Sequence, residues 1–196
     1  MGIARAHRVS YVGELGWEIY VSANMAAHVF ETIIDAGAGH GLKLCGLHMM
    51  DGCRIEKGFR HFGHDITCQD HVLEAGLGFA VKTDKVAPFV GRDAVLRKRE
   101  AGLTTRILQF RLTDPEPMLF HNEPILRDGK IVGYLSSGAY GHHVGGAVGL
   151  GYVPCEGQKP DDILASSYEI DVAGTRVAAE VSLRPLYDPT GSRMRS

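Results

Sequence analysis

The hydrophobic pattern of this chain changes period near residue 103, and this change constrains the fold more than any other feature. Up to that point apolar residues recur mainly at helical spacing, whereas beyond it they alternate in short runs. Asp128-Gly129 and Ala173-Gly174 are typical of two-residue hairpin turns that need positive φ. The runs predict strands over residues 106–112, 124–127, 130–136, 147–153, 167–172 and 176–183. Short strands with such turns indicate a small β-barrel or a sandwich.

The stretch that precedes this boundary reads as a mixture of helices and strands. Helices are predicted over residues 24–36, with Gly37 as the stop, over 46–57, ended by Gly58, and after Phe89 as far as Gly102. Residues 8–21 predict two short strands around a bend at Gly13–Gly16, and residues 77–81 predict another strand. The expected class is therefore α+β.

Glu14 is the most informative single residue, because it lies in the glycine-flanked bend. Glycines allow a flat ligand to approach the backbone closely, and a carboxylate can accept two parallel N–H bonds from an amidine-like edge, such as that of a pterin. The alternative is an ordinary turn whose acidic side chain faces solvent.

Composition excludes several classes of function. The net charge is −2, and Arg97-Lys-Arg99 is the only notable basic run, so no nucleic-acid partner is expected. No apolar stretch approaches the about 20 residues needed to cross a bilayer, so no membrane insertion is expected. Residues 1–7 lack the apolar core of a signal peptide. Four cysteines without a C-x-x-C pair fit a reducing, cytoplasmic compartment.

Residues 11–18, Tyr-Val-Gly-Glu-Leu-Gly-Trp-Glu, resemble the signature of the aminomethyltransferase family. This family comprises the T-protein of glycine cleavage and the folate domains of sarcosine and dimethylglycine dehydrogenases. The sequence of residues 54–60 and 74–82 is more similar to the dehydrogenase branch than to the glycine-cleavage enzyme. One departure from the family is His71-Val72, which stands where the family usually has Thr-Pro. Four further segments agree in order, namely residues 51–66, 73–82, 89–92, and 132–138 with 151–156.

The resemblance implies a folate-binding α+β segment over residues 1–103, followed by a small antiparallel β-barrel domain over 104–196. Family members are longer, and their catalytic aspartate precedes the Tyr-x-Gly-Glu motif. The chain is therefore expected to be the carboxyl-terminal half of such a protein, as a fragment, a truncated gene product or one subunit of a split protein. The partners implied are a missing amino-terminal half or a flavin dehydrogenase subunit, since no G-x-G-x-x-G follows a strand here.

The implied activity is one-carbon transfer from an amine to tetrahydrofolate, with a glycine-derived aminomethyl group, sarcosine or dimethylglycine as donor. Glu14 would take the pterin edge, Arg54 would grip a carboxylate or carbonyl, Tyr11 would lie near the pterin, and Tyr187 near the folate tail. No catalytic residue is assigned, because the acid-bearing half is absent. The compartment would be the mitochondrial matrix if the source is eukaryotic.

Alternatives remain for each of these assignments. The alternative for Arg54 is a surface ion-pair network on the helix with Asp51 or Glu56, and Tyr11 is equally at home as a cross-strand packing partner. The alternative function is a non-catalytic folate-binding or assembly module, and a purely structural partner of a flavin dehydrogenase is a third. A zinc site built from Cys45-x-x-His48 and His61-x-x-His64 is not expected, since the second pair lies in a loop that resembles a non-metal family.

Overall fold

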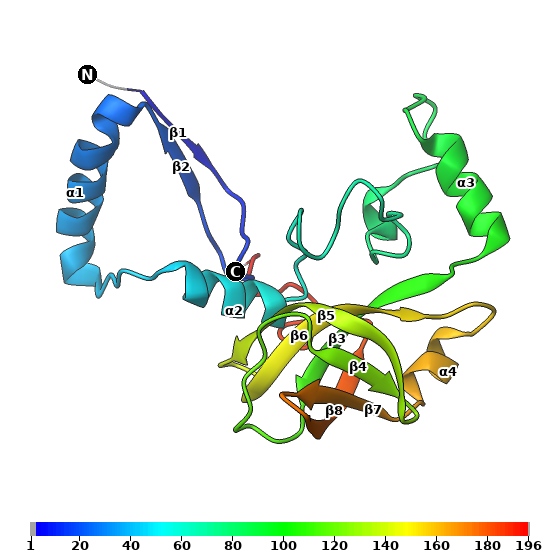
Figure 1. Cartoon of the computed structure of the whole chain (residues 1–196). Helices are drawn as coiled ribbons and strands as arrows, with labels where there is room; N and C mark the ends of the chain where they lie inside the picture. The colour runs from blue at the N-terminus through cyan, green and yellow to red at the C-terminus, as the bar shows by residue number, and fades with distance from the viewer. Residues whose placement is uncertain (1–2, 196) are drawn as a thin grey trace.

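The computed structural model describes residues 3–195, with an arm of helix and ribbon at one end and a barrel at the other (Figure 1). Residues 1 and 2, which begin the stretch expected not to be a targeting segment, lie outside the described residues. The helices and strands, in order, are β1 (Ala4–His7), β2 (Glu18–Val21), α1 (Ala26–Gly37), α2 (Leu47–Glu56), α3 (Arg92–Ala101), β3 (Thr105–Leu112), β4 (Pro124–Arg127), β5 (Lys130–Gly141), β6 (Gly146–Pro154), α4 (Pro160–Leu164), β7 (Tyr168–Val172) and β8 (Thr175–Ser182).

The strands predicted after residue 103 close into an antiparallel barrel in the order β3-β6-β5-β4-β7-β8. Closure leaves the barrel without an unpaired edge, and it decides between the barrel and the sandwich that the sequence allowed. Asp128 and Gly129 have φ values of 51° and 79°, and Ala173 and Gly174 have 51° and 89°, which confirms both hairpin turns. The interior is filled by large apolar side chains, including Phe110, Leu112, Leu119, Ile125, Leu135 and Ile170.

The three predicted helices are present. A 3₁₀-helix at Ala23–Met25 leads into α1, and a second one at Ala38–His40 prolongs it, so the left-handed stop is Gly41 (φ 72°) rather than Gly37. Gly58 (φ 66°) follows α2 and Gly102 (φ 84°) follows α3, as the sequence predicts. The short helix α4, with Pro160 at its first position, was not predicted.

Two strand predictions are corrected. Residues 77–81 do not form a strand but contain a 3₁₀-helix, Gly78–Ala80, because Gly76 (φ 69°) turns the chain and no described strand lies alongside to pair with it. The first ribbon strand is Ala4–His7 rather than a run that begins at Arg8. Residues 8–17 form an irregular loop, in which Ser10 Oγ accepts the Gly13 N–H at 3.0 Å. Such side-chain bonds replace the strand ladder.

The helix α2 joins the amino-terminal arm to the barrel (Figure 1). Its Ile55 packs into a second apolar cluster with Ile107, Val148 and Leu150, which come from β3 and β6. The side-chain amide of Gln109 donates to the carbonyls of Ile55 at 2.5 Å and of Glu56 at 2.9 Å. These bonds satisfy carbonyls at the end of α2, and they fix this end of the helix on the barrel.

Candidate ligand-binding site

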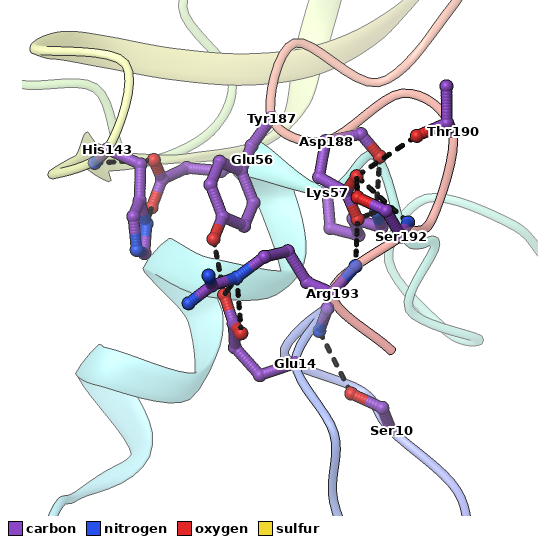
Figure 2. A network of polar contacts seen from close by, with 11 residues as sticks. Ser10, Glu14, Glu56, Lys57, His143, Tyr187, Asp188, Thr190, Ser192 and Arg193 are labelled. Carbon is purple, nitrogen blue, oxygen red and sulfur yellow. Dashed lines mark hydrogen bonds and ion pairs between the residues drawn. The ribbon is translucent and has the colours of Figure 1, made fainter. Parts of the chain in front are cut away.

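Glu14 lies where the loop of residues 8–17 meets the carboxyl-terminal segment of the chain (Figure 2). Its carboxylate accepts a hydrogen bond from the Tyr187 hydroxyl and another from Arg193 Nε at 3.1 Å. The bond from Tyr187, together with that from Arg193 and against the effect of burial, lowers the pKa of the Glu14 carboxyl. The same bond raises the pKa of Tyr187. The carboxylate is therefore ionised and turned toward donors.

Tyr187 is held from behind by the barrel and by α2. Its ring stacks on His143, with centroids 4.1 Å apart and planes at 25°, and its backbone N–H donates to the Glu56 carbonyl at 3.1 Å. The Glu56 side chain is 1% exposed, and its Oε2 accepts the N–H groups of His143 at 2.7 Å and Val144 at 3.1 Å. Its Oε1 lies 3.1 Å from His143 Nδ1. The buried carboxylate thus fixes the β5–β6 hairpin on which Tyr187 rests.

A second ion pair fixes the backbone beside Tyr187. Lys57 Nζ donates to Asp188 Oδ2 at 2.8 Å, and both side chains are almost completely buried (Figure 2). The bond from Lys57, and then that from Ser192, holds the pKa of Asp188 far below its usual range. The Lys57 stem also lies under Gly13, where an added Cβ would stand 2.8 Å from Lys57 Cδ. The loop that carries Glu14 can approach this closely because Gly13 has no side chain.

Arg54 is engaged entirely by protein groups. It is 3% exposed, and its guanidinium donates to Asp65 at 2.5 Å, Asp51 at 3.0 Å and Ser137 at 2.8 Å. Asp65 also accepts from Ser136 Oγ at 2.5 Å. The planar fork therefore joins α2, the loop after it and β5. The ion pair with Asp51 is the one that the alternative interpretation of Arg54 predicted. The Arg54 side chain is buried, however, whereas that interpretation placed the network on the surface.

Tyr11 packs against two rings of the segment that follows α2. Its ring stacks on Phe59 at 6.4 Å and meets His61 edge-on at the same centroid distance. The hydroxyl is buried and has no hydrogen-bond partner among the described residues, and burial raises its pKa. An unpartnered buried hydroxyl costs free energy, so the position suits a ligand that would supply an acceptor or a donor.

A cavity of about 570 Å³ opens beside Arg54. Apolar side chains, including Met49, Met118, Phe120 and Tyr140, form much of its wall, and His61 and His64 also line it. Of the residues that the sequence nominated, only Arg54 lines this cavity; Glu14 and Tyr187 meet each other elsewhere. The structure thus separates the predicted site residues into two neighbouring places.

The comparisons with known proteins agree with this architecture. Residues 2–85 match the GCVT N-terminal domain, and residues 105–188 match the glycine cleavage T-protein C-terminal barrel domain. The chain belongs to the glycine cleavage T-protein family. Its fold is that of a solved aminomethyltransferase T from Bartonella henselae, with a TM-score of 0.80 at 23% identity over 95% of this chain and 50% of that one.

Curated proteins similar to this chain are longer than it is. The 4-methylaminobutanoate oxidase (formaldehyde-forming) of Paenarthrobacter nicotinovorans is 43% identical over 99% of this chain, which spans 23% of that protein. Human mitochondrial sarcosine dehydrogenase is 35% identical over 98% of the chain and 21% of its own length. An aminomethyltransferase of Halothermothrix orenii is 36% identical over 91% of the chain and 48% of its own length. The chain therefore spans a fifth to a half of these relatives.

The described part of the chain meets neither the requirements of a metal centre nor those of a membrane-spanning helix. Residues 3–195 contain no group of three or more histidine, cysteine or acidic side chains placed to hold a metal ion. His61 and His64 contact each other, with ring centroids 4.6 Å apart. No helix within the same residues is long and apolar enough to cross a bilayer.

Sequence reasoning missed five residues of the Glu14 site: Glu56, Lys57, His143, Asp188 and Arg193. Glu56 and Lys57 stand in the Arg-Ile-Glu-Lys run that carried the family resemblance, and a run that pairs an acid with a base at the end of a helix was an available signal. His143 lies in a glycine-rich hairpin, and Arg193 near the end of the chain. Nothing local distinguishes these two from solvated side chains.

Proposed function

We propose that this chain supplies part of the tetrahydrofolate-binding site of an aminomethyltransferase-type one-carbon transferase. The observation that carries the proposal is the meeting of Glu14 with Tyr187 and Arg193. Arg193 donates to this carboxylate through Nε, which lies 3.1 Å from Oε2 and 3.5 Å from Oε1, and the N–H donors on the amino-pyrimidine edge of a pterin would suit the same carboxylate. Family membership and the unpartnered Tyr11 hydroxyl support the same assignment.

In this proposal each residue has a binding task. Glu14 accepts the pterin edge once Arg193, whose side chain is 62% exposed, moves aside. Tyr187 keeps the carboxylate turned toward the ligand, and the Tyr11 hydroxyl donates to a ligand acceptor. Arg54 holds the wall of the neighbouring cavity through Asp65 and Ser137. Tetrahydrofolate would supply the nucleophilic N5 that captures a methylene group from an amine nitrogen. Which amine provides it, whether glycine-derived, sarcosine or dimethylglycine, belongs to the whole protein.

The alternative is a non-catalytic folate-binding or assembly module. It is favoured by the extent to which ionisable groups of the site already serve structure: Arg54, Glu56, Lys57 and Asp188 are all paired within the chain. Both functions predict folate binding, and they differ in turnover. Transfer of a one-carbon unit by the complete protein would support the enzyme, and binding without transfer would support the module.

The test is calorimetric titration of the chain with tetrahydrofolate, comparing the wild type with Glu14→Gln. Glu18→Gln is the matched control, since Glu18 belongs to the same motif but is exposed, and its side chain accepts the Tyr20 hydroxyl at 2.5 Å instead of a group of the Glu14 site. We expect Glu14→Gln to weaken binding at least tenfold, which corresponds to about 1.4 kcal/mol. Weakening by Glu18→Gln alone would transfer the pterin contact to the second carboxylate of the motif. Absence of heat in every protein would overturn the assignment of a folate site to this chain.

A further inference from the structure

The hairpin between β5 and β6 is built around the buried Glu56 carboxylate. Its Oε2 accepts the backbone N–H groups of His143 and Val144, and Arg111 Nη1 donates to the Val144 carbonyl at 2.9 Å. The approach is close, since a Cβ added to Gly141 would stand 3.1 Å from Glu56 Cγ. All of these bonds go to the backbone of the hairpin. The hairpin is therefore anchored without any contribution from the His143 side chain.

The imidazole of His143 nevertheless makes contacts of its own. Its Nδ1 lies 3.1 Å from Oε1 of Glu56, the carboxylate oxygen that does not bind the hairpin backbone. Its ring stacks on Tyr187, with centroids 4.1 Å apart (Figure 2). The His143 side chain is 42% exposed, so it contributes little to an apolar core. A half-exposed ring that is held on one side by a buried carboxylate and touches a phenol on the other acts on that phenol.

The phenol in turn acts on Glu14. The Tyr187 hydroxyl donates to the Glu14 carboxylate, and this bond is the largest cause of the lowered pKa of Glu14, whereas the charge of His143 is a smaller one. The ring torsion of an aromatic side chain is broad unless neighbours restrict it. Stacking on a fixed imidazole restricts the Tyr187 ring, and rotation of this ring would carry the hydroxyl away from the carboxylate.

We propose that His143 is a positioning residue of the Glu14 site, which fixes the Tyr187 ring and thereby the direction in which Glu14 presents its carboxylate to a ligand with N–H donors. Glu56 serves as the anchor of the imidazole. A carboxylate that is held in its binding direction before the ligand arrives loses less freedom on binding, and affinity rises accordingly. The ligand rests on the proposed function, in which it is tetrahydrofolate, but the geometry of Glu14 can be measured without any ligand.

The first experiment measures the pKa of the Glu14 carboxyl by carbon-13 NMR in the absence of folate. His143→Gln removes the ring and keeps an amide donor for Glu56, and His143→Phe keeps a ring and removes the bond to Glu56. We expect both variants to raise the pKa of Glu14 toward 4.5, with the larger rise in His143→Gln. His28→Gln, at an exposed position of α1, is the matched control and should leave the pKa unchanged.

The second experiment asks whether His143 acts through Tyr187. Calorimetric titration with tetrahydrofolate compares the wild type, His143→Gln, Tyr187→Phe and the double variant. We expect His143→Gln to weaken binding about fivefold in the wild type, because residues in contact are coupled by energies of this order. The same change should have no further effect in Tyr187→Phe. A direct effect of the His143 charge on Glu14 would instead persist in that background.

Two results overturn the inference: an unchanged pKa of Glu14 in both His143 variants, or an undiminished effect of His143→Gln on binding when Tyr187 is replaced. If none of the four proteins binds tetrahydrofolate, the proposed function fails separately. The NMR measurement then decides the inference, since a raised pKa of Glu14 still supports the positioning role and an unchanged one still overturns it.

Discussion

The Tyr187 hydroxyl donates a hydrogen bond to the Glu14 carboxylate, across 173 positions of sequence. This contact joins the loop of residues 8–17 to the segment that leaves the last barrel strand. His143 supports Tyr187 from the opposite side through ring stacking, and the buried Glu56 holds the hairpin of His143 in place. Glu14 is therefore positioned by the barrel as well as by its own bend, and its ionisation reports whether this arrangement is intact.

Tyr187→Phe should raise the pKa of Glu14 toward the ordinary value of 4.5, because the bond from Tyr187 is the largest cause of its lowering. The folded pKa is depressed, so the associated stability is present above pH 4.5 and is lost as the pH falls through the folded value. The Glu14 site is partly exposed, so we expect Tyr187→Phe to lower the free energy of unfolding by less than about 1 kcal/mol. Carbon-13 NMR of the carboxyl measures the pKa. Tyr134→Phe, at an exposed position of β5, should leave it unchanged.

Arg54→Met should destabilise the fold by about 3–5 kcal/mol, because it leaves the buried Asp65 carboxylate without its charge partner. Urea unfolding measures the change. The double variant Arg54→Met, Asp65→Asn should recover part of the loss, since it removes the unpaired charge. If the single variant is as stable as the wild type, Arg54 is not needed to hold these segments together, and it would again be a candidate for binding the ligand.

Glu74 should make stability depend on pH in the acid range. Burial raises its pKa, but hydrogen bonds from Lys98, Thr104 and Thr105 outweigh this effect and bring the pKa to about 2. The stabilisation is thus complete above the ordinary value of 4.5 and disappears as the pH falls toward 2. The difference between a pKa of 4.5 and one of about 2 corresponds to about 3 kcal/mol in the free energy of unfolding. Urea unfolding between pH 2.5 and about pH 6 measures it, and Glu74→Gln should flatten the profile.

Gly151→Ala should destabilise the barrel, because an added Cβ would stand 2.5 Å from Ile125 Cδ1 and 2.8 Å from the Tyr134 carbonyl oxygen. We expect a loss of about 1–3 kcal/mol in the free energy of unfolding. Gly39→Ala is the control, since nothing lies within 4 Å of its Cβ position. The control should leave thermal stability unchanged or slightly increased. Similar melting temperatures for the two variants would contradict the close packing between β5 and β6.

Much of the secondary structure was predictable because its determinants are local. Gly58 and Gly102 mark the ends of helices through their positive φ, and Asp128-Gly129 marks a hairpin for the same reason. Residues 77–81 were predicted wrongly, because an apolar run has the same appearance in a strand and in a 3₁₀-helix, and only a neighbouring strand separates the two.

The sequence by itself determined the change from helical to alternating periodicity, the turns, and the motifs that identify the glycine cleavage T-protein family. Only the tertiary structure decided that Glu14 meets Tyr187 and Arg193, and that Arg54 is buried against Asp65 and Ser137. It also decided that the strands close into a barrel. Periodicity and turn chemistry act over a few residues and can be read along the chain. Contacts between Glu14 and residues 187–193 arise only when barrel closure and the docking of α2 bring distant segments together.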